Sequence, residues 1–264
     1  MPTITALILT RFREGAKKVA SWLTKKSYES LFLDLPKELE KFLSVHIEGE
    51  AFVEDLWRSY SYLTGFQEPF INAMRYTVDP ILDALAQFRS RLHELKVYCY
   101  QDLEYYMEAR KLSERLLILE TKSKMSSRIG VEEWRRLLRD EVEGETSGFV
   151  KSVENIAEEA IAHPKSVVLY QGTVKPFKNY MESEGFTVET IYLQHYWRSP
   201  LEALRVIART QGVDHIPDDV IARCVQHHLR YIDYVLSSED IDAAHEKWTL
   251  ETHSTFLGKT IIVR

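Results

Sequence analysis

The sequence predicts an α/β protein with a mostly parallel central sheet of about five strands, and three observations support this prediction. Short apolar runs alternate with longer segments of helical spacing, as in successive strand–helix–strand units. Most of these runs are almost continuously apolar, which is typical of strands buried on both faces of a parallel sheet. The segments between the runs are long enough for the crossovers that parallel neighbours need. The predicted strands cover residues 6–10, 30–35, 96–102, 166–171 and 187–193.

The predicted helices follow from apolar side chains spaced three and four residues apart. One ends before Pro164 and another before Gly185, residues that commonly follow a helix C-terminus. These helices cover residues 11–25, 50–63, 147–162 and 175–184.

The order of these elements predicts the domain organisation. Helical insertions at residues 36–95 and 103–163 interrupt an α/β core over residues 1–198. A helical C-terminal subdomain follows over 199–264, in which residues 259–263 would add a final strand. The last core strand alternates apolar and polar residues, which favours an edge position. The small polar segment 123–130 is the expected internal loop.

Composition and charge exclude several classes of function. The formal net charge of −6 argues against dedicated nucleic-acid binding, which needs a basic face. The longest apolar runs are too short for a membrane span or a secretion signal, so we expect a cytoplasmic protein with no membrane contact. The basic residues of segment 134–139 have acidic neighbours, which indicates a solvated helix of mixed charge.

The cysteine and histidine patterns give no metal site. There is no Cys-x-x-Cys pair, which excludes a zinc ribbon. Cys99 lies in an apolar strand, so we expect it to be buried and unreactive. The nine histidines include no pair with ligand spacing, so we name no metal ligand and no cofactor.

Polar residues at the ends of the predicted strands are the candidate site. Ligands of open parallel sheets bind outside the carboxyl ends of the strands, because loops and helix N-termini converge there. Each residue also has a structural alternative: a helix cap for the acids, an ion pair for the arginines and a tight turn for the glycine. The residues are Asp34 and Asp102 as catalytic acids, and Arg11, Arg13, Gly172 and Lys175 as substrate-binding groups.

Three segments resemble the TraB/ChaN/erythromycin-esterase-like superfamily. Residues 6–39 are similar to its first strand, helix and second strand, and segment 96–102 is similar to its third strand, which ends in Asp. Residues 145–160, followed by the strand 166–172 and the helix 177–185, are similar to its later helix, strand and helix. The resemblance adds Glu145 to Asp34 and Asp102 as an acidic position matched to the family's site.

The same resemblance implies peptide or ester hydrolysis, in some members with a divalent metal. However, the family's histidines would fall near residues 11–15 and 173–175, where this chain has none. The Arg-Asp pair of the family helix falls on Thr146 and Ser147.

Two functions from different classes therefore remain open. The absent histidines favour a non-catalytic binding or assembly protein that contacts a protein partner or another copy of itself through its helical insertions. The alternative is a hydrolase with a rearranged site, in which the acids hold a divalent metal or activate water and Arg11 holds an anionic group.

Overall fold

A computed structural model describes residues 1–87, 95–195 and 197–257. The chain forms two compact units, the first from Met1–Met107 with Ser147–His195 and the second from Glu108–Thr146 with Tyr196–Arg264. Residues 108–146 thus group with the C-terminal helices rather than with the sheet, because their apolar side chains pack against those helices. The predicted final strand at residues 259–263 lies outside the described residues.

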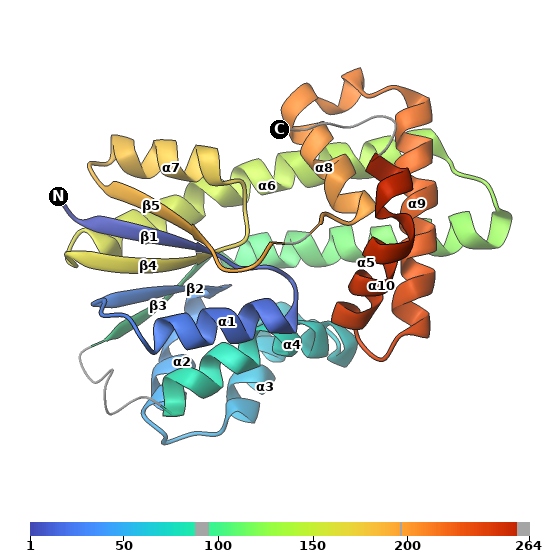
Figure 1. Cartoon of the computed structure of the whole chain (residues 1–264). Helices are drawn as coiled ribbons and strands as arrows, with labels where there is room; N and C mark the ends of the chain where they lie inside the picture. The colour runs from blue at the N-terminus through green and yellow to red at the C-terminus, as the bar shows by residue number, and fades with distance from the viewer. Residues whose placement is uncertain (88–94, 196, 258–264) are drawn as a thin grey trace. The chain divides into compact units, whose positions relative to one another are not determined.

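The first unit is built on a five-stranded parallel sheet, which confirms the predicted fold class. Every neighbouring pair of strands is parallel, and the order is β3-β2-β4-β1-β5 (Figure 1). The predicted edge position of β5 is therefore correct. The strands are β1 (Thr3–Ile8), β2 (Ser30–Pro36), β3 (Lys96–Gln101), β4 (Lys165–Tyr170) and β5 (Thr187–Tyr192).

Strand β1 starts earlier and ends earlier than its apolar run predicts. Ile4 pairs with Ser166 of β4 on one side and with Val188 of β5 on the other. Because both neighbours supply hydrogen bonds, the β-branched residues Thr3 and Thr5 extend the strand even though they are polar.

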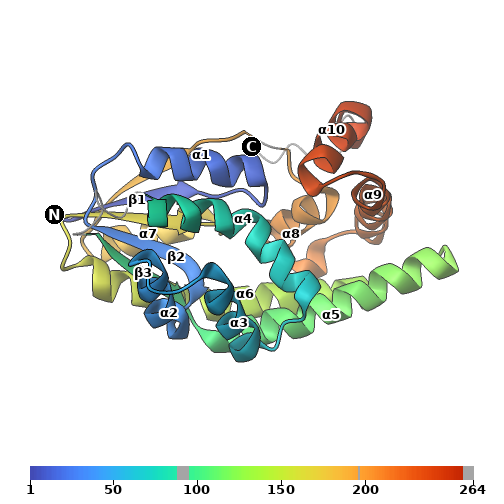
Figure 2. The same ribbon diagram turned by 90° about the horizontal axis from the view of Figure 1, so that it is seen from below.

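Helices cover the two faces of this sheet in different groups. One face packs against the helices that follow β1 and β2, and Figure 2 shows α1 and α4 side by side. The other face packs against the last turns of α6 and against α7. The helices of this unit are α1 (Arg13–Leu23), η1 (Lys37–Leu39), α2 (Glu40–Ile47), α3 (Val53–Thr64), α4 (Glu68–Gln87) and α7 (Val174–Ser183); α5 (Leu103–Ser126) and α6 (Val131–Ala160) contribute to both units.

The second unit is helical and surrounds the fully buried side chain of Trp134. A capping box starts α8: the Ser199 hydroxyl accepts the backbone N–H of Glu202, and the Glu202 carboxylate accepts the N–H of Ser199. Besides α5 and α6, this unit contains α8 (Pro200–Gln211), η3 (Val213–His215), α9 (Asp218–Ser237) and α10 (Ile241–Leu257).

Two local expectations for the second unit were wrong. Segment 123–130 is not a loop throughout, because α5 continues to Ser126 and buries Ser123, whose hydroxyl accepts a hydrogen bond from the Trp134 indole at 3.3 Å. The helix after Trp134 is not uniformly solvated either. Arg135 and Glu141 are buried, because tertiary partners neutralise both charges.

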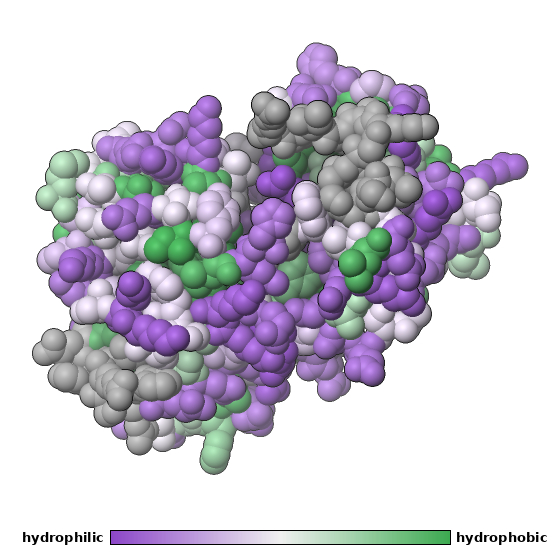
Figure 3. Space-filling model, viewed as in Figure 1, coloured by the Kyte–Doolittle hydropathy of each residue, from purple (hydrophilic) through white to green (hydrophobic). Residues whose placement is uncertain are grey.

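The surface of the protein is largely polar on the face that Figure 3 draws. Figure 3 shows hydrophilic side chains over most of the visible face, with smaller apolar areas between them. None of the described helices combines the length and the apolar character that crossing a bilayer requires.

Candidate functional site

The strand order creates a topological switch point at the carboxyl edge of the sheet. Strands β1 and β4 are neighbours, yet α1 after β1 packs on one face and α7 after β4 packs on the other. The two connections therefore leave the sheet edge in opposite directions. Such a switch point is where open parallel sheets bind their ligands.

Asp34, near the end of β2, is a carboxylate at this edge whose pKa is raised. It lies inside β2, two residues before Pro36, and not at a helix N-terminus, so the cap alternative is wrong for this residue. The side chain is half-buried, and burial raises its pKa to about 6. A hydrogen bond from Gln101 and the positive charge of Arg11 act in the opposite direction, towards a lower pKa.

A chain of side chains from three segments holds the Asp34 carboxylate. The Ser152 hydroxyl of α6 donates to Oε1 of Gln101 at 2.6 Å, so the amide nitrogen of Gln101 is left to donate to Asp34. The Tyr106 hydroxyl, from the second turn of α5, donates to the backbone carbonyl of Asp34 at 2.7 Å. The carboxylate and its backbone are therefore both fixed by tertiary contacts.

Aromatic side chains enclose the same region. Tyr60 of α3 is fully buried and packs edge-on against Tyr106, with ring centres 5.8 Å apart. Burial, and then the negative charge of Asp34, raise the pKa of Tyr60, so it stays protonated. Its hydroxyl has no hydrogen-bond partner among the described residues. This edge thus combines one carboxylate with apolar aromatic walls.

Arg11 follows β1 at an exposed position, and its charge acts on Asp34. The α1 helix begins two residues later. Gly15, near its start, has no side chain and so leaves room for the hydrogen bond between Thr10 and Gln194. A Cβ atom on Gly15 would lie 2.0 Å from Oγ1 of Thr10. Arg11 is near enough to Asp34 for its positive charge to act on the pKa of the carboxyl group.

Asp102 follows β3 at the same edge but is engaged in structure. Its carboxylate accepts the backbone N–H of Glu104 at 2.7 Å, which caps α5, and its other oxygen lies 3.1 Å from Nζ of Lys151. Lys151 also pairs with Glu104 at 2.9 Å. The structural alternative for Asp102 thus fits better than catalysis.

The remaining expected substrate-binding residues take separate positions. Arg13 begins α1, and its guanidinium lies 5.4 Å from the ring centre of Tyr76, so it stacks on an aromatic face. Gly172 and Lys175 are exposed after β4. A Cβ atom on Gly172 would lie 2.4 Å from the hydroxyl of Tyr170, whose buried ring packs against Phe177, so the glycine fits a tight turn that passes close over this ring.

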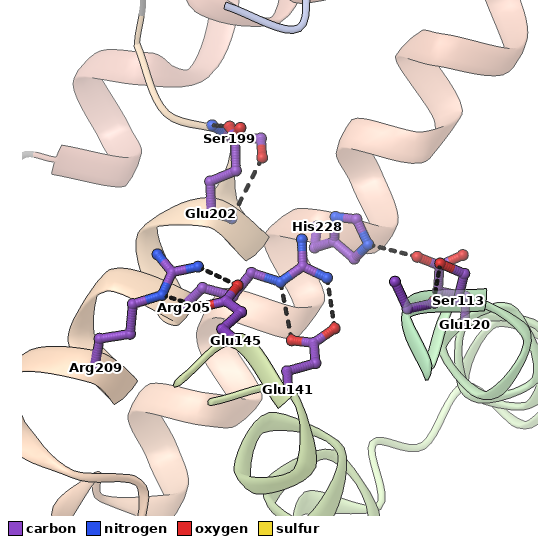
Figure 4. Close-up of polar contacts among 10 residues, drawn as sticks. Ser113, Glu120, Glu141, Glu145, Ser199, Glu202, Arg205, Arg209 and His228 are labelled. Atoms are coloured by element: carbon purple, nitrogen blue, oxygen red, sulfur yellow. Dashed lines mark hydrogen bonds and ion pairs between the residues drawn. The ribbon is translucent and has the colours of Figure 1, made fainter. Parts of the chain in front are cut away.

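Glu145 belongs to the second unit and is not part of the Asp34 cluster. Both of its oxygens pair with Arg209 of α8, each at 2.5 Å (Figure 4). One turn earlier on α6, Glu141 forms the same kind of bidentate ion pair with Arg205, at 2.6 and 2.9 Å. The two pairs form a ladder between α6 and α8.

A further contact, made by the buried His228, lies in the same unit. Nε2 of His228, on α9, is 2.7 Å from Oε1 of Glu120 on α5 (Figure 4). The imidazole lies edge-on to the indole of Trp134. Nδ1 of His228 has no partner among the described residues. Together with the ladder, this contact ties α5, α6, α8 and α9 into one helical unit.

Sequence reasoning missed Gln101, Ser152 and the pair Glu141–Arg205. Gln101 stood one residue before a predicted site position, but an amide there carries no distinctive signal. The two ion pairs between α6 and α8 do have a signal in the sequence, because the two acids on α6 and the two arginines on α8 are each four residues apart. That spacing became informative only when the two helices were known to be neighbours.

Comparisons with known proteins give no match to a family model, to a curated protein or to a solved structure. Among the described residues, no three His, Cys, Asp or Glu side chains gather in a way that could hold a metal ion. The fold and site thus define an α/β protein with the half-buried carboxylate of Asp34 at its sheet edge and a helical second unit.

Proposed function

We propose that this chain is a non-catalytic binding or assembly protein that contacts its partner through the helical second unit. One observation carries the proposal: Leu117, Ile118 and Met125 of α5 are 56%, 64% and 84% exposed. With Thr121, Lys122 and Ser126 they line an open groove of about 720 Å³. We call Leu117, Ile118, Thr121 and Met125 the α5 stripe.

The α5 stripe differs from isolated apolar residues on a surface. Its members recur at helical spacing and so form one continuous face, whereas the opposite face of α5 packs into the core around Trp134. Grouped apolar side chains in water mark interaction sites more often than single ones do. The state of the candidate acids agrees with this proposal, because ion pairs engage both Asp102 and Glu145.

The proposal can be tested with a photo-crosslinking amino acid placed at Ile118, and at exposed Lys26 as the control. We expect a crosslinked protein product from position 118, either in the purified protein or in an extract of its native cells. The product should be absent from position 26 and should disappear when Met125→Glu is added. Equal products from both positions, or no product from position 118 in either setting, would contradict the proposal.

A second candidate is hydrolysis of an ester or peptide at the sheet edge. It is favoured by Asp34, whose pKa of about 6 suits a general base near neutral pH, and by the nearby charge of Arg11. A panel of chromogenic esters and peptides tests it. Turnover that Asp34→Asn abolishes and Asp102→Asn preserves would favour this function over the first.

A further inference from the structure

Two acceptors compete for the single hydrogen of the Ser152 hydroxyl on α6. Its oxygen lies 2.6 Å from Oε1 of Gln101, the last residue of β3, and 2.7 Å from the backbone carbonyl oxygen of Gly148, one turn earlier on α6. A hydroxyl donates one hydrogen bond and accepts up to two, so it serves one of these oxygens at a time. Ser152 is 4% exposed, so protein groups rather than bulk water decide which one.

The side-chain amide of Gln101 connects Ser152 to Asp34. Its oxygen faces Ser152, and its hydrogen bond to the carboxyl group of Asp34 opposes the effect of burial on the pKa of that group. A half turn of an amide exchanges its acceptor oxygen and its donor nitrogen and leaves the other atoms in place. Both orientations of the Gln101 amide therefore fit the same packing.

We infer that Asp34, Gln101 and Ser152 form a relay with two hydrogen-bond states, and that protonation of Asp34 changes one state into the other. In the ionised state, Gln101 donates to the carboxylate and accepts from Ser152. When Asp34 takes a proton from solvent, the Gln101 amide turns, so that Oε1 accepts from the new hydroxyl. The amide nitrogen then donates to Oγ of Ser152, whose own hydrogen turns to the carbonyl of Gly148.

The two states satisfy the same rule for buried polar groups. Each hydrogen bond of the relay joins a donor to an acceptor before and after the change, and none joins two donors or two acceptors. The second acceptor of Ser152 is what makes this possible, because without the Gly148 carbonyl the Ser152 hydrogen would still point at the turned amide nitrogen. The change therefore needs no rearrangement of α6 or β3.

Asp34 controls the relay because its proton equilibrium lies near neutral pH. Burial raises its pKa to about 6, against the effects of Gln101 and Arg11. The guanidinium of Arg11, after β1, keeps its charge throughout this range. Burial, and then the charge of Asp34, raise the pKa values of the surrounding tyrosines, which stay protonated; they are Tyr60 of α3, Tyr100 of β3 and Tyr106 of α5.

The charges beside the relay, on α6 and after β3, pair with one another. Nζ of Lys151 lies 3.1 Å from the carboxylate of Asp102 and 2.9 Å from that of Glu104. The side chains of Lys151 and Glu104 are 46% and 86% exposed, so solvent screens their action on Asp34. The protonation of Asp34 is therefore the event that the relay follows.

The relay makes the carboxyl edge of the sheet sensitive to pH without repacking it. Below about pH 6 the edge carries a neutral acid whose proton is held by Gln101, and above it a carboxylate. All residues of the relay belong to the first unit, so the inference is independent of the contact proposed for α5. It is also independent of whether the edge catalyses a reaction.

The carbonyl carbon of Gly148 reports the relay, because its ¹³C chemical shift changes when its oxygen accepts a further hydrogen bond. In wild type we expect this shift to follow pH with the same midpoint as the carboxyl carbon of Asp34, about 6. Ser152→Ala removes the hydroxyl. The Gly148 shift should then no longer depend on pH, although Asp34 still titrates.

Asp34→Asn provides a second and independent test. The nitrogen of the introduced amide donates to Oε1 of Gln101 at every pH, as the protonated acid does. The Gly148 shift should therefore stay at its low-pH value throughout the titration. Asp102→Asn, at the same edge of the sheet, is the matched control and should leave the titration of Gly148 as in wild type.

Three results would overturn the relay. The first is a Gly148 shift that does not follow the titration of Asp34 in wild type. The second is a Gly148 titration that persists in Ser152→Ala, because the charge of Asp34 would then act through space. The third is a Gly148 shift in Asp34→Asn that matches the high-pH form of wild type, and this comparison decides by itself if Ser152→Ala does not fold.

Discussion

The hydroxyl of Tyr106 donates a hydrogen bond to the backbone carbonyl of Asp34 at 2.7 Å, which joins the start of α5 to the end of β2. Tyr106 is buried, so its hydroxyl would otherwise lack a partner. The contact fixes the strand end that carries the half-buried carboxylate.

Tyr106→Phe should therefore lower the free energy of unfolding by about 1 kcal/mol, since it leaves a buried carbonyl unpaired. Tyr62→Phe is the control, because Tyr62 is 88% exposed and should change stability little. Urea denaturation of both variants measures the difference. Equal stability of the two would show that water replaces the Tyr106 hydroxyl.

The titration of Asp34 should appear as a pH-dependent difference between wild type and Asp34→Asn. Burial raises the pKa of Asp34 from its ordinary value of 3.8 to about 6, so folding favours the protonated form. That contribution is complete below about pH 4 and is lost as the pH rises through about 6. The unfolding free energy of Asp34→Asn relative to wild type should therefore rise by on the order of 2 kcal/mol between pH 4 and pH 7.

Unfolding by urea at a series of pH values provides the measurement, with Asp102→Asn as the matched control. Asn at position 102 keeps the helix cap, so a pH-dependent difference that appears only in Asp34→Asn can be assigned to Asp34. If the difference in unfolding free energy between Asp34→Asn and wild type did not change with pH, the carboxylate would be better solvated than its surroundings indicate.

Asp102→Ala tests the capping role directly. It removes the acceptor for the Glu104 N–H and should cost about 1 kcal/mol, whereas Asp102→Asn should cost a few tenths. The pair with Lys151 contributes little, because the Lys151 side chain is 46% exposed. Thermal melts that placed both variants at the same stability would argue against a cap.

The two ion pairs between α6 and α8 should contribute very differently to the free energy of unfolding. Breaking the buried pair by Arg205→Leu should cost about 3 kcal/mol or more, because Glu141 keeps a buried and uncompensated charge. The double variant Glu141→Leu/Arg205→Leu should recover much of that loss.

The more exposed pair, Arg209 with Glu145, is the control for the buried pair. Arg209→Leu should cost less than about 1 kcal/mol, since Arg209 and Glu145 are 32% and 38% exposed. Similar losses at both rungs would mean that burial does not distinguish them. Double-mutant cycles by chemical denaturation provide the measurement.

Cys99 should react with thiol reagents only when the protein unfolds. It is 2% exposed, and burial, followed by the charge of Glu40, raises its pKa well above the ordinary value, so little thiolate forms. An introduced Lys26→Cys should label rapidly in the same sample. Labelling of Cys99 at the rate of that control would contradict its burial.

The sequence by itself determined the fold class, the five strands and the positions of most helices. Apolar periodicity records burial locally, so 166–171 could be recognised as a buried strand and 187–193 as an edge strand without knowledge of their neighbours. The same logic placed Asp34 and Arg11 at one edge, because parallel strands end together. Strand order was not readable, since similar apolar runs carry little information about which of them pair.

Only the tertiary structure decided what each polar side chain does. Asp34 depends on Gln101 and Ser152, and Glu141 on Arg205, residues that are more than fifty positions apart in sequence. The division at residues 108–146 likewise follows from packing around Trp134. A pKa or an ion pair is set by the groups that surround a side chain in space, and those groups come from distant segments that local patterns do not connect.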